Sequence, residues 1–135
     1  MTLARYDELV ASLEDAVALA EIDVANHGET GAYNAAPGYA LASFEAALAQ
    51  AISYRDYFVS YPVLYPGVAY NLRFRDVQES MWYAGHWANV SAVYHASEEA
   101  REYHALTEVI VDQANALRAD AGRCYQDWAF TTPSP

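Results

Sequence analysis

Residues 76–99 read DVQESMWYAGHWANVSAVYHASEE, and this stretch predicts an α-helical fold. Asp76 and Glu79 have the spacing of a capping box, in which two side chains satisfy the free backbone N–H groups at the start of a helix. No proline follows before the last three residues of the chain, and apolar residues recur at intervals of three and four. We therefore predict a helix over residues 76–96.

This predicted helix carries two apolar stripes. One comprises Val77, Met81, Ala84, Ala88 and Ala92, and the other comprises Tyr83, Trp87, Val90 and Tyr94. A helix that is apolar on most sides is either central in its bundle or covered by another molecule. Its uncharged stretch, residues 81–96, is shorter than the about 20 apolar residues that a membrane span needs. We expect no membrane segment here, and we take the two stripes as a sign of a binding partner.

The end of the quoted stretch, Ser97-Glu98-Glu99, has the pattern of a second helix start, with a capping residue followed by acids. An unbroken helix over residues 76–129 would be ~80 Å long, which is long for a domain of this size. We expect a kink or break at Ser97 and hence four helices; continuity through Ser97 is the alternative. Beyond the break, a seam with approximate heptad spacing comprises Leu106, Ile110, Gln113, Leu117, Ala121, Cys124 and Trp128.

Earlier in the chain, apolar periodicity predicts helices over about residues 3–26 and 38–59. Residues 60–75, SYPVLYPGVAYNLRFR, interrupt the helical pattern because Pro62 and Pro66 favour extended and turn conformations. The expected fold is all-α, a bundle of three or four helices with a long Pro/Tyr-rich loop. We expect a single helical domain over residues 1–130 and a flexible C-terminal tail over residues 131–135.

The composition restricts the partners of this chain. Its net charge is −11, with seven arginines and no lysine, so we expect neither direct nucleic-acid binding nor attraction to anionic membranes. Cys124 is the single cysteine, which leaves no intrachain disulfide and favours a reducing compartment. No apolar segment follows the N-terminus as it would in a signal peptide. We expect a cytoplasmic protein, or one incorporated in a virion.

Aromatic residues crowd the end of the second predicted helix and the loop that follows. Tyrosine and tryptophan bury a large area at low entropic cost and are enriched in interfaces. The predicted partner-binding residues are Tyr54, Tyr57, Tyr61, Tyr65, Tyr70, Phe74, Trp87 and Tyr94. The alternative is that this loop folds back over the core, and the two interpretations are compatible.

The histidines offer a metal-binding alternative. His86, His95 and His104 lie nine residues apart, half a turn out of phase, so they cannot hold one ion on a straight helix. Pairs with i,i+4 spacing could each supply two ligands, with acids of other helices completing a site. The alternative ligand set is His95, Glu99, His104 and Glu108. Ordinary surface His–Glu pairs explain these residues better, and we expect no metal and no cofactor.

Catalytic patterns are missing from the sequence. Cys124 lies on an apolar seam, and there is no glycine-rich phosphate loop or nucleophile elbow. We expect a small, acidic, non-enzymatic protein that acts through protein–protein binding, by self-association as an assembly subunit or as an inhibitor of a host enzyme. An inhibitor of this kind would resemble phage-encoded proteins whose acidic surface competes with nucleic acid, a likeness of charge and size alone. Whether the acidic faces act in binding or only confer solubility stays open.

Overall fold

The computed structural model describes residues 3–27, 35–61 and 75–131, with the backbone alone for Arg75 and residues 121–131, and these described residues form four helices. They are α1 (Leu3–His27), α2 (Ala36–Ser60), α4 (Arg75–Tyr94) and α5 (Glu98–Thr131), and these ranges contain no strand. The all-α expectation is confirmed. Residues 62–74 of the predicted loop and 132–135 of the predicted tail lie outside the described residues, while residue 131 is still helical.

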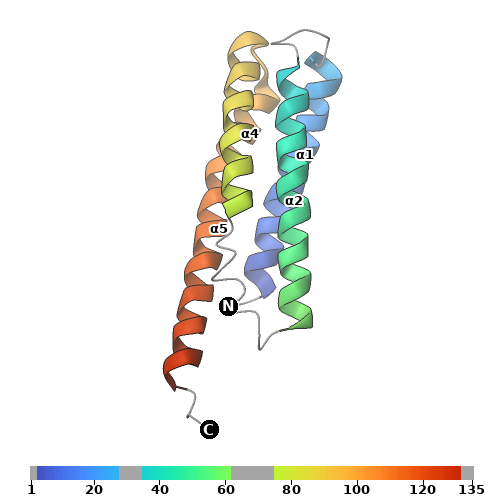
Figure 1. Ribbon diagram of the computed structural model, residues 1–135. Helices are drawn as coiled ribbons and strands as arrows, with labels where there is room; N and C mark the ends of the chain where they lie inside the picture. The colour runs from blue at the N-terminus through green and yellow to red at the C-terminus, as the bar shows by residue number, and fades with distance from the viewer. Residues whose placement is uncertain (1–2, 28–34, 62–74, 132–135) are drawn as a thin grey trace.

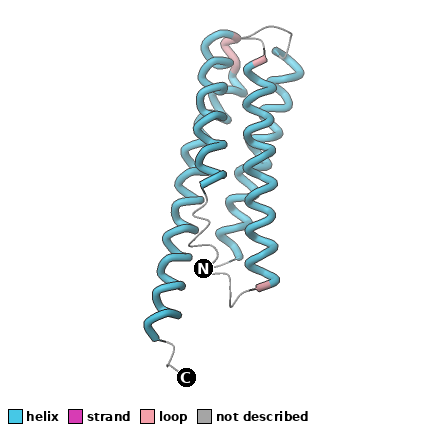
Figure 2. The backbone as a smooth tube through the Cα atoms, viewed as in Figure 1, coloured by secondary structure: helices cyan, strands magenta, loops and turns pink. Residues whose placement is uncertain are grey.

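The helices run alternately up and down and form a closed ring (Figure 1). The helix α1 packs against α2 and α5, and α4 packs against the same two helices, so α1 and α4 stand on one diagonal. The short connection between α4 and α5, residues 95–97, favours the antiparallel order of these two neighbours. The lower part of α5 extends past the ends of the other helices (Figure 2). The helix α4 contacts α2 and α5, and its remaining side forms part of the outer surface of the bundle.

Core positions follow a heptad pattern, alternating steps of three and four residues. On α1 and α2 they are Tyr6, Leu9, Leu13, Ala16, Ala20 and Asp23, and Ala40, Phe44, Ala47, Ala51 and Tyr54. On α4 and α5 they are Val77, Met81, Ala84, Ala88 and Ser91, and Ala100, Tyr103, Thr107, Ile110, Ala114 and Leu117. Such spacing keeps one seam of each helix directed at its partners along its full length.

Alanine is the commonest residue in this core, and its small side chain lets neighbouring helix backbones approach closely. The remaining space is filled by a few large side chains. Phe44 and Tyr103 meet edge to face across the bundle, with ring centroids 5.6 Å apart. This geometry is the one that aromatic quadrupoles favour. The core thus combines many alanines with a smaller number of large aromatic and aliphatic side chains.

The predicted break at Ser97 is present. The helix α4 ends at Tyr94, and Ala96 adopts a left-handed backbone conformation with φ of 52°. Ser97 then caps α5, because its Oγ accepts a hydrogen bond from the backbone N–H of Ala100 at 3.1 Å. Continuity through Ser97 is therefore excluded.

Two details of the sequence prediction were wrong. The helix α4 begins at Arg75, so Asp76 lies in its first turn and accepts a hydrogen bond from Gln50 of α2 at 2.7 Å instead of serving as the N-cap. On α5, Leu106 and Gln113 are only half-buried, and Tyr103, Thr107 and Ala114 occupy the core seam with Ile110 and Leu117. The seam was predicted from apolar character alone. That criterion misplaced it, because the core seam includes a threonine and a tyrosine whose hydroxyl is hydrogen-bonded.

Candidate functional site

The two apolar stripes of α4 have different surroundings. Val77, Met81, Ala84 and Ala88 are buried in the core, with Ser91 in the last core position and Ala92 half-buried. The second stripe lies outside, where Trp87 and Val90 are half-buried and Tyr83 and Tyr94 are exposed. The bundle therefore buries one stripe and leaves the other at its surface.

Four apolar side chains of α4 are largely exposed, and we call them the α4 face: Trp82 (70% exposed), Tyr83 (46%), Val93 (78%) and Tyr94 (58%). Trp82 and Val93 are eleven residues apart, as are Tyr83 and Tyr94, and eleven residues complete just over three turns of helix. Each pair therefore lies on one line along the helix. No charged residue occurs from position 81 to position 96, in a chain of net charge −11. Because large exposed apolar patches often mark interaction sites, we take the α4 face as the candidate site.

Neighbouring rings hold parts of this surface in place. Trp87 packs on Tyr39 of α2 with ring centroids 4.7 Å apart, and His86 meets Trp87 edge to face at 4.8 Å. Trp82 and Tyr83 contact each other at 5.0 Å. No helix within the described ranges is long and apolar enough to cross a membrane. The aromatic residues of α4 thus form a largely supported surface on the outside of the bundle.

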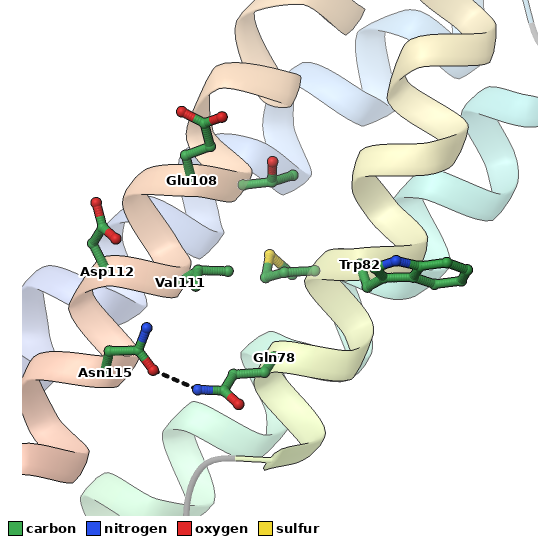
Figure 3. Close-up of a pocket in the computed structure, with 8 residues that line it drawn as sticks. Gln78, Trp82, Glu108, Val111, Asp112 and Asn115 are labelled. Carbon is green, nitrogen blue, oxygen red and sulfur yellow. Dashed lines mark hydrogen bonds between the residues drawn. The ribbon is translucent and has the colours of Figure 1, made fainter.

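Two pockets lie between α4 and α5 beside the α4 face, and we call them together the α4–α5 groove. Its lower part has a volume of about 560 Å³ and is lined by Trp82, Glu108 and Asp112, among others. In Figure 3 a hydrogen bond between Gln78 and Asn115 joins the two helices at one end, the two acids project from α5, and the ring of Trp82 stands on the side away from α5.

The upper part of this groove is the second pocket, which has a volume of about 510 Å³ and whose lining includes Val93, Arg101 and His104. The α5 side of the groove therefore changes character along its length. It carries a guanidinium and an imidazole at one end and two carboxylates at the other.

The predicted partner-binding residues lie in different environments. Tyr54 is a core residue, 7% exposed, and burial together with the nearby charge of Asp76 raises the pKa of its hydroxyl, so its ring serves the interior and not the surface. Tyr57 is half-buried and packs against the exposed Tyr61 with ring centroids 4.9 Å apart. Trp87 is half-buried and Tyr94 exposed, and the remaining predicted residues, Tyr65, Tyr70 and Phe74, lie outside the described residues.

The sequence analysis did not single out Trp82 and Val93, the two most exposed side chains of the α4 face. The signal that could have identified them is their eleven-residue spacing inside an uncharged stretch, out of phase with the core heptads. Both lie on the outside of the bundle for that reason.

The alternative metal ligands are not brought together. His95 stacks on His27 of α1 with ring centroids 5.0 Å apart, and its Nε2 is buried without a hydrogen-bond partner among the described residues. His104 lines the upper groove, whereas Glu108 lines the lower one. Within the described part of the chain, no group of three or more His, Cys, Asp or Glu side chains is arranged to hold a metal ion.

A buried carboxylate occupies the end of the bundle nearest the α4–α5 connection. Asp23 of α1 is 0% exposed and accepts hydrogen bonds from the hydroxyls of Ser91 and Ser97, each at 2.7 Å. The hydroxyl of Tyr103 donates a third at 2.6 Å, and Nδ1 of His27 is 2.9 Å away. We call these five residues the Asp23 cluster. It ties α1 to α4, to the start of α5 and to its second turn.

The hydrogen bonds of this cluster determine the protonation state of Asp23. Burial alone would raise the pKa of Asp23, but the bonds from Tyr103, Ser97, Ser91 and His27 together outweigh it, and the pKa lies below its ordinary value. Burial and the bond to Asp23 raise the pKa of the Tyr103 hydroxyl. Asp23 is therefore a fully partnered anion and Tyr103 a fixed donor. Both properties suit a structural role better than proton transfer at neutral pH.

Comparison of this chain with protein-family models, with curated proteins and with solved structures found no match. The functional argument therefore rests on the residues and their geometry.

Proposed function

We propose that this protein is a non-enzymatic helical bundle that acts by binding another protein through the α4 face. The observation that carries this proposal is the exposure of Trp82 and Val93 on a surface without charges, in a strongly acidic chain. Covering that surface would remove apolar area from water, the dominant favourable term in protein association. Tryptophan and tyrosine are also the residues that most often dominate binding energy.

Two modes of action are consistent with such a surface. The protein can be a subunit of an assembly, or it can inhibit a host enzyme by occupying part of it. An inhibitor that competes with nucleic acid would instead use acids such as Glu8, Asp15 and Glu21, which are exposed on α1. Binding through those acids would weaken steeply with salt, whereas burial of the α4 face would not. We favour the α4 face because its exposed rings are unusual for a solvent-facing helix.

The test is a comparison of the wild-type protein with a variant that carries Trp82→Ser and Val93→Ser. Sedimentation velocity measures self-association, and quantitative capture from an extract of the source organism measures binding to other proteins, at low and high salt. We expect association that the double variant loses and that persists at high salt. The matched control carries Ile22→Ser and Val109→Ser, which change exposed apolar residues of α1 and α5 and should retain binding. Absence of any association that depends on Trp82 and Val93 would exclude this function.

A further inference from the structure

We infer that the partner of the α4 face is a second copy of this chain, bound antiparallel about a two-fold axis that crosses the α4–α5 groove. This inference rests on the proposed function and names its partner. In the resulting contact, Trp82 of each copy packs on Val93 of the other, and Arg101 of each copy faces Glu108 of the other.

The level of each residue along the two helices fixes where such an axis can lie. The helices α4 and α5 are antiparallel neighbours, so residue numbers rise along one as they fall along the other. Gly85 lies beside Thr107, where a Cβ on the glycine would be 3.7 Å from the threonine Oγ1, and Gln78 is hydrogen-bonded to Asn115. By this register, positions 87–88 of α4 are level with positions 104–105 of α5.

Both key pairs are symmetric about that level. The midpoint of Trp82 and Val93 falls between positions 87 and 88, and the midpoint of Arg101 and Glu108 falls between positions 104 and 105. A two-fold axis at this level and perpendicular to the helices therefore exchanges the members of both pairs at once. Isologous contacts require this kind of self-complementarity, in which residue i meets residue j and j meets i.

The charges along α5 select the antiparallel arrangement. Arg101 and His104 line the upper part of the groove, and Glu108 and Asp112 line the lower part. An antiparallel second copy places its acidic end against the basic end of the first, whereas a two-fold axis parallel to the helices would place α5 of each copy against the uncharged stretch of α4 of the other and form no such charge pair. Arg101 is 62% exposed and pairs with Glu98 of its own helix at 3.2 Å, a solvent-exposed pair of the kind that contributes little. Its guanidinium can therefore also serve a second carboxylate.

Net charge also favours this face as the meeting place of two copies. Two chains of net charge −11 repel each other wherever their acidic surfaces approach. The α4 face lies within the uncharged stretch of residues 81–96, and the groove beside it carries charges of both signs. It is thus a surface on which two copies can approach with little repulsion.

The size of the contact sets its expected strength. Sixteen residues of helix are about 24 Å long, and two helices side by side are about 20 Å wide, so each copy would cover about 500 Å². The total of about 1,000 Å² is at the lower end of specific interfaces. We therefore expect a reversible dimer with a dissociation constant on the order of micromolar.

A charge exchange tests this contact. Arg101→Glu and Glu108→Arg each place like charges together twice per dimer, and each should raise the dissociation constant about tenfold in sedimentation equilibrium. The double variant Arg101→Glu with Glu108→Arg restores opposite charges and should return the constant to within about threefold of wild type. Because the double variant also has the net charge of the wild type, its recovery reports position and not overall charge.

The matched control is Glu102→Arg, which changes the charge by the same amount as Glu108→Arg but on the side of α5 that faces α1, beside Asp15 and Leu19. It should leave the dimer as tight as wild type or slightly tighter, since it lowers repulsion between copies. Circular dichroism of each variant should show unchanged helix content, because the substituted side chains are exposed.

The outcomes separate this inference from the proposed function. Recovery in the double variant supports the two-fold contact. A wild-type dimer that depends on Trp82 and Val93 but is not restored by the charge exchange would overturn the arrangement and leave binding through the α4 face intact. A wild-type monomer at all concentrations would overturn self-association, while the capture experiment would still decide the broader function. A dimer that is insensitive to Trp82 and Val93 would overturn both.

Discussion

The Asp23 cluster and the α4 face invert the usual distribution of side chains in opposite senses. The first puts a carboxylate in the interior, and the second puts aromatic and aliphatic side chains in solvent. The buried carboxylate is fully partnered by groups of its own chain, at distances of 2.6 to 2.9 Å. These hydrogen bonds within the folded chain explain why a carboxylate can be buried there. Among the described residues, no comparable set of contacts accounts for the exposure of Trp82 and Val93, and this difference is why we propose a structural role for one region and binding for the other.

The largest expected effect comes from Asp23→Ala. This substitution removes the acceptor from the hydroxyls of Ser91, Ser97 and Tyr103 and leaves a small cavity. Breaking a buried, hydrogen-bonded charge typically costs about 3–5 kcal/mol, and we expect a loss in that range in the free energy of unfolding. Urea denaturation followed by circular dichroism measures it.

Asp23→Asn provides the milder companion. It keeps the size and one acceptor oxygen, so its cost should be clearly below that of alanine and the variant should stay folded. Equal costs for both substitutions, or a cost near zero for alanine, would show that the cluster does not stabilise the fold.

A smaller effect separates two serines that both donate to Asp23. Each serine hydroxyl donates a hydrogen bond to Asp23, and the Ser97 hydroxyl in addition accepts the N-cap hydrogen bond of α5. Loss of an N-cap costs about 1 kcal/mol, and loss of a hydrogen bond to a charged group about 1.5–3 kcal/mol. Ser97→Ala should therefore lower the free energy of unfolding by about 1 kcal/mol more than Ser91→Ala. The same denaturation assay measures both, and Ser91→Ala costing more would contradict the capping role.

Lowering the pH should reduce the contribution of Asp23 to the free energy of unfolding. Its folded pKa lies below the ordinary value of 3.8, so the stability it contributes is complete above that value and is lost as the pH falls toward the folded pKa. Other carboxylates titrate in the same range, so the useful quantity is the difference between wild type and Asp23→Asn. We expect this difference to be constant from neutral pH to about pH 5 and to narrow below pH 3.8. A difference that widens in acid would mean that the pKa of Asp23 is raised.

The sequence predicted the helices well because their signals are local. Apolar periodicity placed α1 and α4 within about two residues of their observed ends, and the cap at Ser97 predicted the break before α5. The start of α2 was placed two residues late, because Pro37 was taken as part of the preceding loop although proline suits the first turn of a helix.

The Asp23 cluster could not be predicted in the same way. Its members come from three helices and the turn before α5, separated by up to 80 residues, and no local pattern connects them. Asp23 is one of several acids on α1, and the others are exposed. Its one distinguishing feature is that it continues the heptad of Tyr6, Leu9, Leu13, Ala16 and Ala20, a signal that is visible only when the period is known.

The smallest expected effect completes the comparison. Trp82→Ser with Val93→Ser should change the free energy of unfolding of the monomer by no more than about 0.5 kcal/mol, because exposed side chains contribute little to folding. The measurement belongs at the lowest usable protein concentration, since dimerisation would add a concentration-dependent term. Met81→Ala, at the buried position next to Trp82, should cost about 2–5 kcal/mol in the same assay. If Trp82→Ser with Val93→Ser cost as much as Met81→Ala, these side chains would serve the fold, and the reason for assigning them to a partner would disappear.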